Sequence, residues 1–101
     1  MTDPVTTEVV QSVARMATDQ ASRYLQQLCK HFGHKVPASF DAEQGEITFP
    51  FGTCRLAAEP GVLTLGVSAA PADLERMQTV IASHLVRFAF REELSVDWQP
   101  A

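Results

Sequence analysis

Short runs of alternating apolar and polar residues, separated by turn signals, occupy the middle of this chain. Residues 46–49 read Glu-Ile-Thr-Phe and lead into Pro-Phe-Gly at 50–52. Residues 53–58 alternate in the same way and lead into Glu-Pro-Gly at 59–61, after which residues 63–67 alternate again. Because successive side chains of a strand point to opposite faces, these runs predict antiparallel strands joined by tight turns.

Two apolar stripes with helical spacing flank these runs. The first consists of Ala21, Tyr24, Leu25, Leu28, Cys29 and Phe32, and the second of Leu74, Met77, Ile81, Leu85 and Phe88. Steps of three and four residues place each set on one face of a helix. We expect Thr18 or Asp19 to cap the first helix, Gly33 to end it in a left-handed conformation, and Pro71 to lie in the first turn of the second.

The remaining segments are less regular. Residues 10–18 fit either a short edge strand or an early helical turn, and residues 36–40 are expected to be extended. A turn is expected at 41–45 and a final strand at 94–98, whereas residues 1–9 are expected to be frayed. The prediction is one α+β domain over residues 1–101 with two layers: an antiparallel meander sheet of four to six strands and two helices packed on one face.

Composition limits where the protein works. A net charge of -4 argues against binding of nucleic acid. No apolar run approaches the ~20 residues that a membrane span needs, and the first residues lack the basic-then-apolar pattern of a signal peptide. The expected location is therefore the cytoplasm, where Cys29 and Cys54 would be free thiols or metal ligands, with a disulfide bridge as the less favoured alternative.

The run Cys-Lys-His-Phe-Gly-His-Lys at residues 29–35 gathers the groups with the most chemistry. A metal would draw its ligands from Cys29, His31, His34 and Cys54, with His84 as a further donor. Against this reading, residues 29 and 31 point in different directions on a helix, and both cysteines occupy apolar positions typical of a core.

An anion is the alternative ligand. If the carboxyl-terminal ends of the two helices pack in parallel, they bring together His31, His34, Lys35, His84, Arg87 and Arg91, with Lys30 beside them. Such a positive patch would suit a carboxylate or a phosphate. The competing interpretation is that these side chains are solvated partners of the helix dipoles, with His84 at the boundary of the core.

Catalysis receives little support, because the chain has no phosphate-binding loop, nucleophile elbow or metalloprotease motif. No catalytic residue and no cofactor is identified. A thiol or redox enzyme using Cys29 or Cys54 is one alternative to a binding domain. The other is a structural protein that pairs through a sheet edge near Val10 or Val36, as a monomer with a partner or as a homodimer.

Three blocks of sequence, at residues 23–35, 49–54 and 84–94, resemble the small bacterial proteins of the family named domain of unknown function 2218. The resemblance covers residues 12–98. It implies a cytoplasmic bacterial protein without an assigned activity, associated with siderophore-interacting reductases and iron uptake, so that the ligand could be an iron chelate. It points to the same residues as the chemistry does: Cys29, His31, His34, Lys35, Cys54, His84, Arg87 and Arg91.

Overall fold

The computed structural model describes residues 9–101, so most of the segment expected to be frayed, residues 1–8, lies outside the described part. The elements follow in the order β1 (Val10–Ala17), α1 (Ala21–Phe32), β2 (Ala38–Phe40), β3 (Gln44–Phe49), β4 (Gly52–Glu59), β5 (Val62–Ala69), α2 (Leu74–Phe88) and β6 (Gln99–Pro100). Neither described helix is long and apolar enough to cross a membrane.

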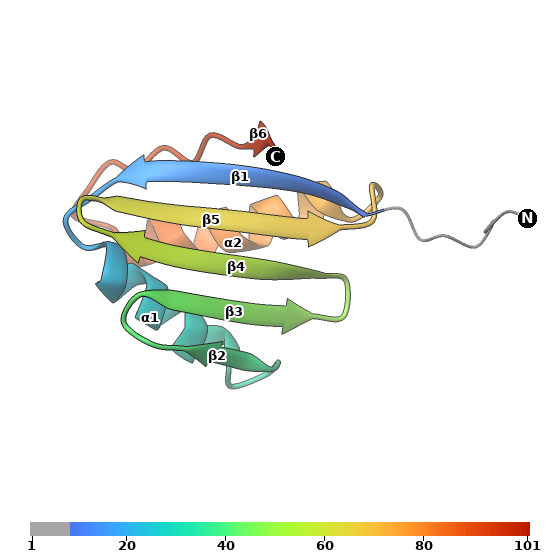
Figure 1. Cartoon of the computed structure of the whole chain (residues 1–101), viewed down its shortest axis with the longest axis horizontal. Helices are drawn as coiled ribbons and strands as arrows, with labels where there is room; N and C mark the ends of the chain where they lie inside the picture. Colours follow the sequence, from blue (N-terminus) through green and yellow to red (C-terminus); the bar gives the residue numbers. More distant parts are fainter. Residues whose placement is uncertain (1–8) are drawn as a thin grey trace, which may run out of the picture.

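All six strands form one antiparallel sheet in the order β2-β3-β4-β5-β1-β6. Strands β2 to β5 are the predicted meander. The segment that fitted either a strand or a helix is the strand β1, which pairs with β5 from Val10 opposite Ala69 to Ala17 opposite Val62. Both helices cover the same face of the sheet, as Figure 1 shows. The predicted two-layer α+β fold is confirmed.

The core lies between the sheet and the helices. Strands β1, β3, β4 and β5 turn alternate side chains inward, as β5 does with Leu63, Leu65 and Val67, which are 0–1% exposed. The predicted stripes supply the other wall, including Leu25 on α1 and Ile81 on α2, which are fully buried. Burying one such side chain stabilises the fold by roughly 1.5–3 kcal/mol.

The predictions for the helix ends need correction. Gln20, rather than Thr18 or Asp19, precedes α1, and no side chain caps the helix. The Thr18 hydroxyl accepts from the backbone N–H of Gln20 and donates to Glu92. Gly33 has a φ of -62° and is not left-handed. The backbone N–H groups of residues 35 and 36 both donate to the carbonyl of residue 32, so the chain leaves α1 in further right-handed turns.

Two further expectations were wrong. Pro71 lies in the turn before α2, which begins at Leu74. Residues 94–98 do not form a strand, and within the chain after α2 the pairing with β1 comes from β6. Their alternation reflects packing alone, because Leu94, Val96 and Trp98 lie against the core while the residues between them face solvent. The predicted turn at Pro60-Gly61 is present, with Gly61 at a φ of 78°.

Candidate functional site

His31 lies in the last turn of α1 and is exposed, but its ring is close to other aromatic rings. The centroid of the His31 ring is 4.9 Å from that of His84 and 5.6 Å from that of Phe88, both on α2. Phe32 packs edge-on against it at 4.9 Å and also contacts His84 at 4.8 Å. The two predicted histidines therefore meet across the junction of the helices.

His84 is half-buried and fixed by its own helix. Its Nδ1 lies 2.7 Å from the carbonyl oxygen of Val80, one turn earlier. Because a carbonyl can only accept, this contact assigns a hydrogen to Nδ1 and leaves Nε2 as the ring nitrogen available to another partner. The His84 ring is thereby held beside His31.

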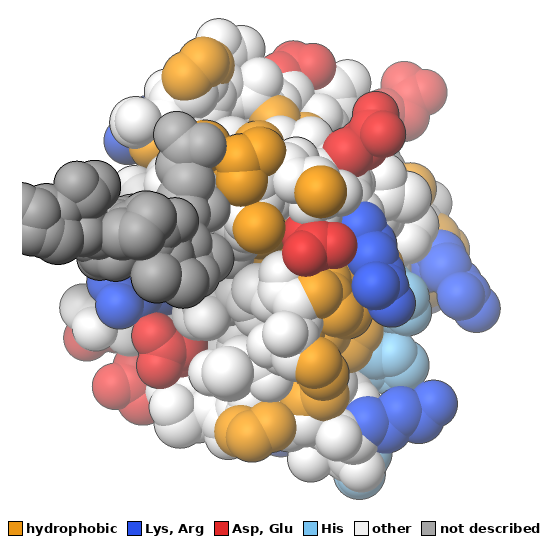
Figure 2. Space-filling model, turned by 90° about the vertical axis from the view of Figure 1, so that its right-hand side faces the viewer, with side chains coloured by type: hydrophobic (Ala, Val, Ile, Leu, Met, Phe, Trp, Pro, Cys, Tyr) orange, Lys and Arg blue, Asp and Glu red, His pale blue; other side chains and the backbone are white. Residues whose placement is uncertain are grey.

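Four groups that carry or can gain a positive charge act on His31. Its pKa is lowered first by partial removal of the ring from water, and then by the charges of His84, Lys35, Arg87 and His34, in that order. No carboxylate is among the groups that shift it. Figure 2 shows histidine, lysine and arginine side chains gathered on one side of the molecule. We call His31, His34, Lys35, His84 and Arg87 the His31 cluster.

The sequence explains the charge of this region. No aspartate or glutamate occurs between residues 20 and 40, which include α1 and the turns after it. None occurs between residues 76 and 91, which include most of α2. Although the chain has a net charge of -4, its carboxylates lie outside both segments that form the cluster. An anion placed there would meet attraction from several sides.

The helices run antiparallel, and not in parallel as the hypothesis of an anion patch supposed (Figure 1). The end of α1 meets the last turns of α2 through His31, whereas the start of α1 meets the chain beyond α2, where Tyr24 contacts Glu92. Arg91 is not among the groups that shift the pKa of His31. It lines a separate hollow together with Arg23, near the start of α1.

The cysteines lie elsewhere. Cys29 and Cys54 are 1% and 0% exposed, are not bridged, and lie in the core between α1 and β4. Burial raises the pKa of the Cys29 thiol to about 11. The pKa of Cys54 is raised by burial and then by Cys29. Neither thiol is therefore activated as a nucleophile.

The four residues predicted as metal ligands are divided by this arrangement. Cys29 and Cys54 point into the core, whereas His31 and His34 are exposed at the end of α1. Among residues 9–101 there is no group of three or more His, Cys, Asp or Glu side chains placed to share a metal ion.

Sequence reasoning missed the hollow between the start of α1 and the chain after α2. It has a volume of about 480 Å³ and is lined by Asp19, Gln20, Arg23, Tyr24, Gln27, Phe88, Phe90, Arg91 and Glu92. The spacing of Arg23, Gln27 and His31, four residues each, could have suggested a polar flank on α1. The contribution of Glu92 depends on a contact across 68 residues, for which the sequence carries no local signal.

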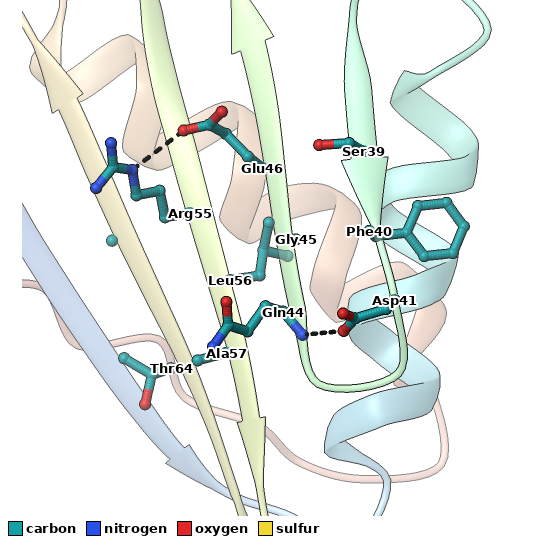
Figure 3. A pocket seen from close by; sticks show the side chains of 11 residues that line it. Ser39, Phe40, Asp41, Gln44, Gly45, Glu46, Arg55, Leu56, Ala57 and Thr64 are labelled. Atoms are coloured by element: carbon teal, nitrogen blue, oxygen red, sulfur yellow. Dashed lines mark hydrogen bonds and ion pairs between the residues drawn. The ribbon is translucent and has the colours of Figure 1, made fainter.

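A second hollow, of about 710 Å³, lies over strands β2 to β5. Figure 3 shows Glu46 and Arg55 joined there across β3 and β4, with Gln44, Ala57 and Thr64 further along. The ion pair is 3.1 Å long and both side chains are well exposed. Such pairs add about 0–1 kcal/mol. The one basic residue that lines this hollow, Arg55, is thus paired, and the other acidic residue there is Asp41.

Comparisons with known proteins agree with the sequence blocks. The family described as "Uncharacterized protein conserved in bacteria (DUF2218)" matches residues 13–99. The NMR structure of PA4090 from Pseudomonas aeruginosa is similar, with 39% sequence identity and a TM-score of 0.76. The similarity covers 91% of this chain and 97% of the other. No curated protein shows a significant match.

Proposed function

We propose that this chain, which belongs to the family of uncharacterized proteins conserved in bacteria (DUF2218), is a binding domain for a small anionic molecule. The site is the His31 cluster at the junction of α1 and α2. The main support is that His84, Lys35, Arg87 and His34 all lower the pKa of His31. No carboxylate is among the groups that shift this pKa.

Three features make the cluster suited to an anion. Lys35 and Arg87 supply permanent positive charge, and Arg87 can present two N–H donors to a carboxylate or a phosphate. His84 is held by Val80, so its free nitrogen is oriented in advance. The rings of Phe32 and Phe88 exclude part of the water around His31, which strengthens charge interactions there.

Isothermal titration calorimetry with inorganic phosphate, citrate and ferric citrate tests the proposal. We expect binding that weakens with added salt, because exposed charges are screened. Arg87→Ala and Lys35→Ala should each reduce the affinity by about 3- to 10-fold, in line with the loss of one partly exposed charge. Heat changes that are absent, or equal in the wild type and both variants, would contradict it.

Arg15→Ala is the matched control. Arg15 is an exposed arginine on β1, on the alternate face from the buried Ala14 and Met16. Its removal changes the net charge as Arg87→Ala does, but away from the helix junction. Equal losses in the two variants would assign the binding to general electrostatics and not to the cluster.

Ferric citrate extends the test to iron chemistry. The association with siderophore-interacting reductases and iron uptake is implied by the family resemblance and stays a prediction. A ferric chelate that binds through its carboxylates would need no protein ligand on the iron. This suits a site that is rich in histidine and lysine side chains and does not hold a set of three metal donors. Binding of ferric citrate at least tenfold tighter than of citrate would favour this ligand.

The cytoplasm is the proposed location. The two cysteines are free, which suits a reducing compartment, although their burial would protect them elsewhere as well. Cell fractionation of a strain that expresses the tagged protein tests this assignment, and recovery outside the cytoplasm would contradict it.

A further inference from the structure

His84 brings an acceptor, rather than a donor, to the His31 cluster. Its Nδ1 carries the hydrogen, because that nitrogen lies 2.7 Å from the carbonyl oxygen of Val80 and a carbonyl cannot donate. In a neutral imidazole the other nitrogen, Nε2, then has a lone pair and no hydrogen. The ring is half-buried, and exchanging the two nitrogens would break the bond to Val80. The fold therefore sets which hydrogen bond His84 can make.

The other polar members of the cluster are not restricted in this way. Lys35 and Arg87 carry donors only, so they bind anionic oxygens in any case. His31 and His34 are exposed, and an exposed neutral imidazole can present a hydrogen from either of its nitrogens. His84 is thus the member that would discriminate between ligands with and without a hydrogen to donate.

The surroundings of His84 do not supply that hydrogen. Its ring centroid is 4.9 Å from that of His31 and 4.8 Å from that of the buried Phe32. Phe32 in turn packs against Phe49 of β3, so the side facing the sheet is uncharged. No carboxylate is among the groups that act on the neighbouring His31. At mildly alkaline pH, above the ordinary range of histidine titration, Nε2 therefore remains an acceptor.

We propose that the His31 cluster prefers an anion that itself carries a proton, such as hydrogen phosphate, over a fully ionised anion such as sulfate. Lys35 and Arg87 would bind the charged oxygens, and the hydroxyl of the ligand would donate to Nε2 of His84. A fully ionised oxyanion has lone pairs alone, so its oxygen at that position would face the lone pair of Nε2. This inference rests on the proposed anion binding and adds the class of anion that the site accepts.

The preference should disappear in acid. Once Nε2 gains a proton, His84 becomes a donor and accepts sulfate as readily as phosphate. Binding of sulfate and protonation of His84 then assist each other, so the affinity for sulfate rises as the pH falls through the range of histidine titration. The charged or titratable groups that face the two stacked imidazoles come from the end of α1 and from α2, and they are His34, Lys35 and Arg87.

Calorimetric titration of the full chain with phosphate and with sulfate, at equal ionic strength, tests the preference. At mildly alkaline pH both ligands are mainly dianions of the same shape, and they differ in the proton. We expect phosphate to bind about tenfold tighter there, in line with one hydrogen bond gained instead of two opposed lone pairs. At a pH below about 6.5 the ratio should fall to about threefold or less.

His84→Gln should remove the preference at both pH values, because an amide can rotate to present either its oxygen or its NH₂ group. His34→Gln is the matched control and should keep the preference, since it removes a histidine of the same cluster whose ring is exposed. Nitrogen NMR of the wild type reads the His84 ring directly. With phosphate bound at mildly alkaline pH, the hydrogen should be on Nδ1 and not on Nε2, which tests the proposal even if His84→Gln does not fold.

The outcomes separate the two proposals. Equal affinities for sulfate and phosphate at mildly alkaline pH, with phosphate binding weakened by Arg87→Ala, overturn the preference and leave the proposed function standing. A preference that survives His84→Gln, or a hydrogen found on Nε2 in the neutral ring, also overturns it. If neither anion binds to the wild type, the proposed function fails and this inference fails with it.

Discussion

The hydroxyl of Tyr24 on α1 donates a hydrogen bond to the carboxylate of Glu92, 68 residues further along the chain. Thr18, in the turn before α1, donates to both oxygens of the same carboxylate at 3.0 and 3.1 Å. One side chain thus joins the start of α1 to the chain that leaves α2. Glu92 fixes the antiparallel arrangement of the helices at the end away from His31.

Replacing Tyr24 by phenylalanine should lower the free energy of unfolding by about 1–3 kcal/mol, since hydrogen bonds to charged groups are worth this much. Urea unfolding monitored by circular dichroism measures the loss. In a double-mutant cycle with Glu92→Gln, the two losses should not add, because both variants break one network. Glu93→Gln, which changes the exposed neighbouring glutamate, is the control. Additive losses for the Tyr24 and Glu92 variants would contradict the network.

Tyr24 should ionise at unusually high pH. Its pKa is raised from 10.0, first by burial and then by the hydrogen bond and charge of Glu92. The unfolded chain loses the phenolic proton first, so this contribution to stability is complete below pH 10.0 and is lost as the pH rises through the folded pKa.

The ultraviolet absorbance of the phenolate measures this ionisation, and Tyr24 is the only tyrosine of the chain. The same chain in urea supplies the reference value. Glu92→Gln should bring the native pKa part of the way back, since burial remains. A native midpoint equal to that in urea would show that the ring is in contact with water.

Both thiols should react slowly with a disulfide reagent at neutral pH. Burial raises the pKa of Cys29 to about 11 and also raises that of Cys54, so the reactive thiolate is scarce and shielded. We expect at least a hundredfold faster reaction of both in urea, where the core is open. Fast reaction of one thiol in the native protein would restore the thiol-enzyme alternative, and Cys29→Ala would identify which one.

Gly45→Ala should destabilise the protein by about 1–3 kcal/mol, because the added methyl overpacks the core. A Cβ at Gly45 would lie 2.7 Å from the sulfur of Cys29 and 3.3 Å from a methyl of Leu25. Adding Cys29→Ala should recover part of the loss. Gly66→Ala is the matched strand control, since its Cβ would meet nothing closer than 3.9 Å; equal losses would contradict the packing argument.

Arg87→Ala should raise the pKa of His31, because it removes one of the charges that lower it; His84, Lys35 and His34 remain. His31 binds its proton less well in the folded than in the unfolded chain, so stability falls as the pH drops from the usual 6.5 through the folded pKa. An NMR titration of the three histidines measures the shift. Arg15→Ala should leave it unchanged, and an unaltered value in Arg87→Ala would separate Arg87 from the cluster.

The strands and helices could be predicted from the sequence because burial of one face of an element places apolar residues at regular intervals. The stripe ending at Phe32 and the alternation around Leu65 are examples. The sequence could place His31, His34 and Lys35 together, since they are neighbours in the chain. It placed Arg87 and Arg91 in the same patch and could not separate them, because that division follows from the antiparallel packing of the helices.

The pairing of β1 also sets the order in which the sheet can be completed. Among the described elements, β1 is made first, yet its main partner is β5, whose residues emerge after α1 and three more strands. During synthesis, both edges of β1 therefore stay unpaired until the residues of β5 have been made. A shortened chain that begins after α1 would therefore lose an interior strand of the sheet, and leave β5 and β6 without the partner between them.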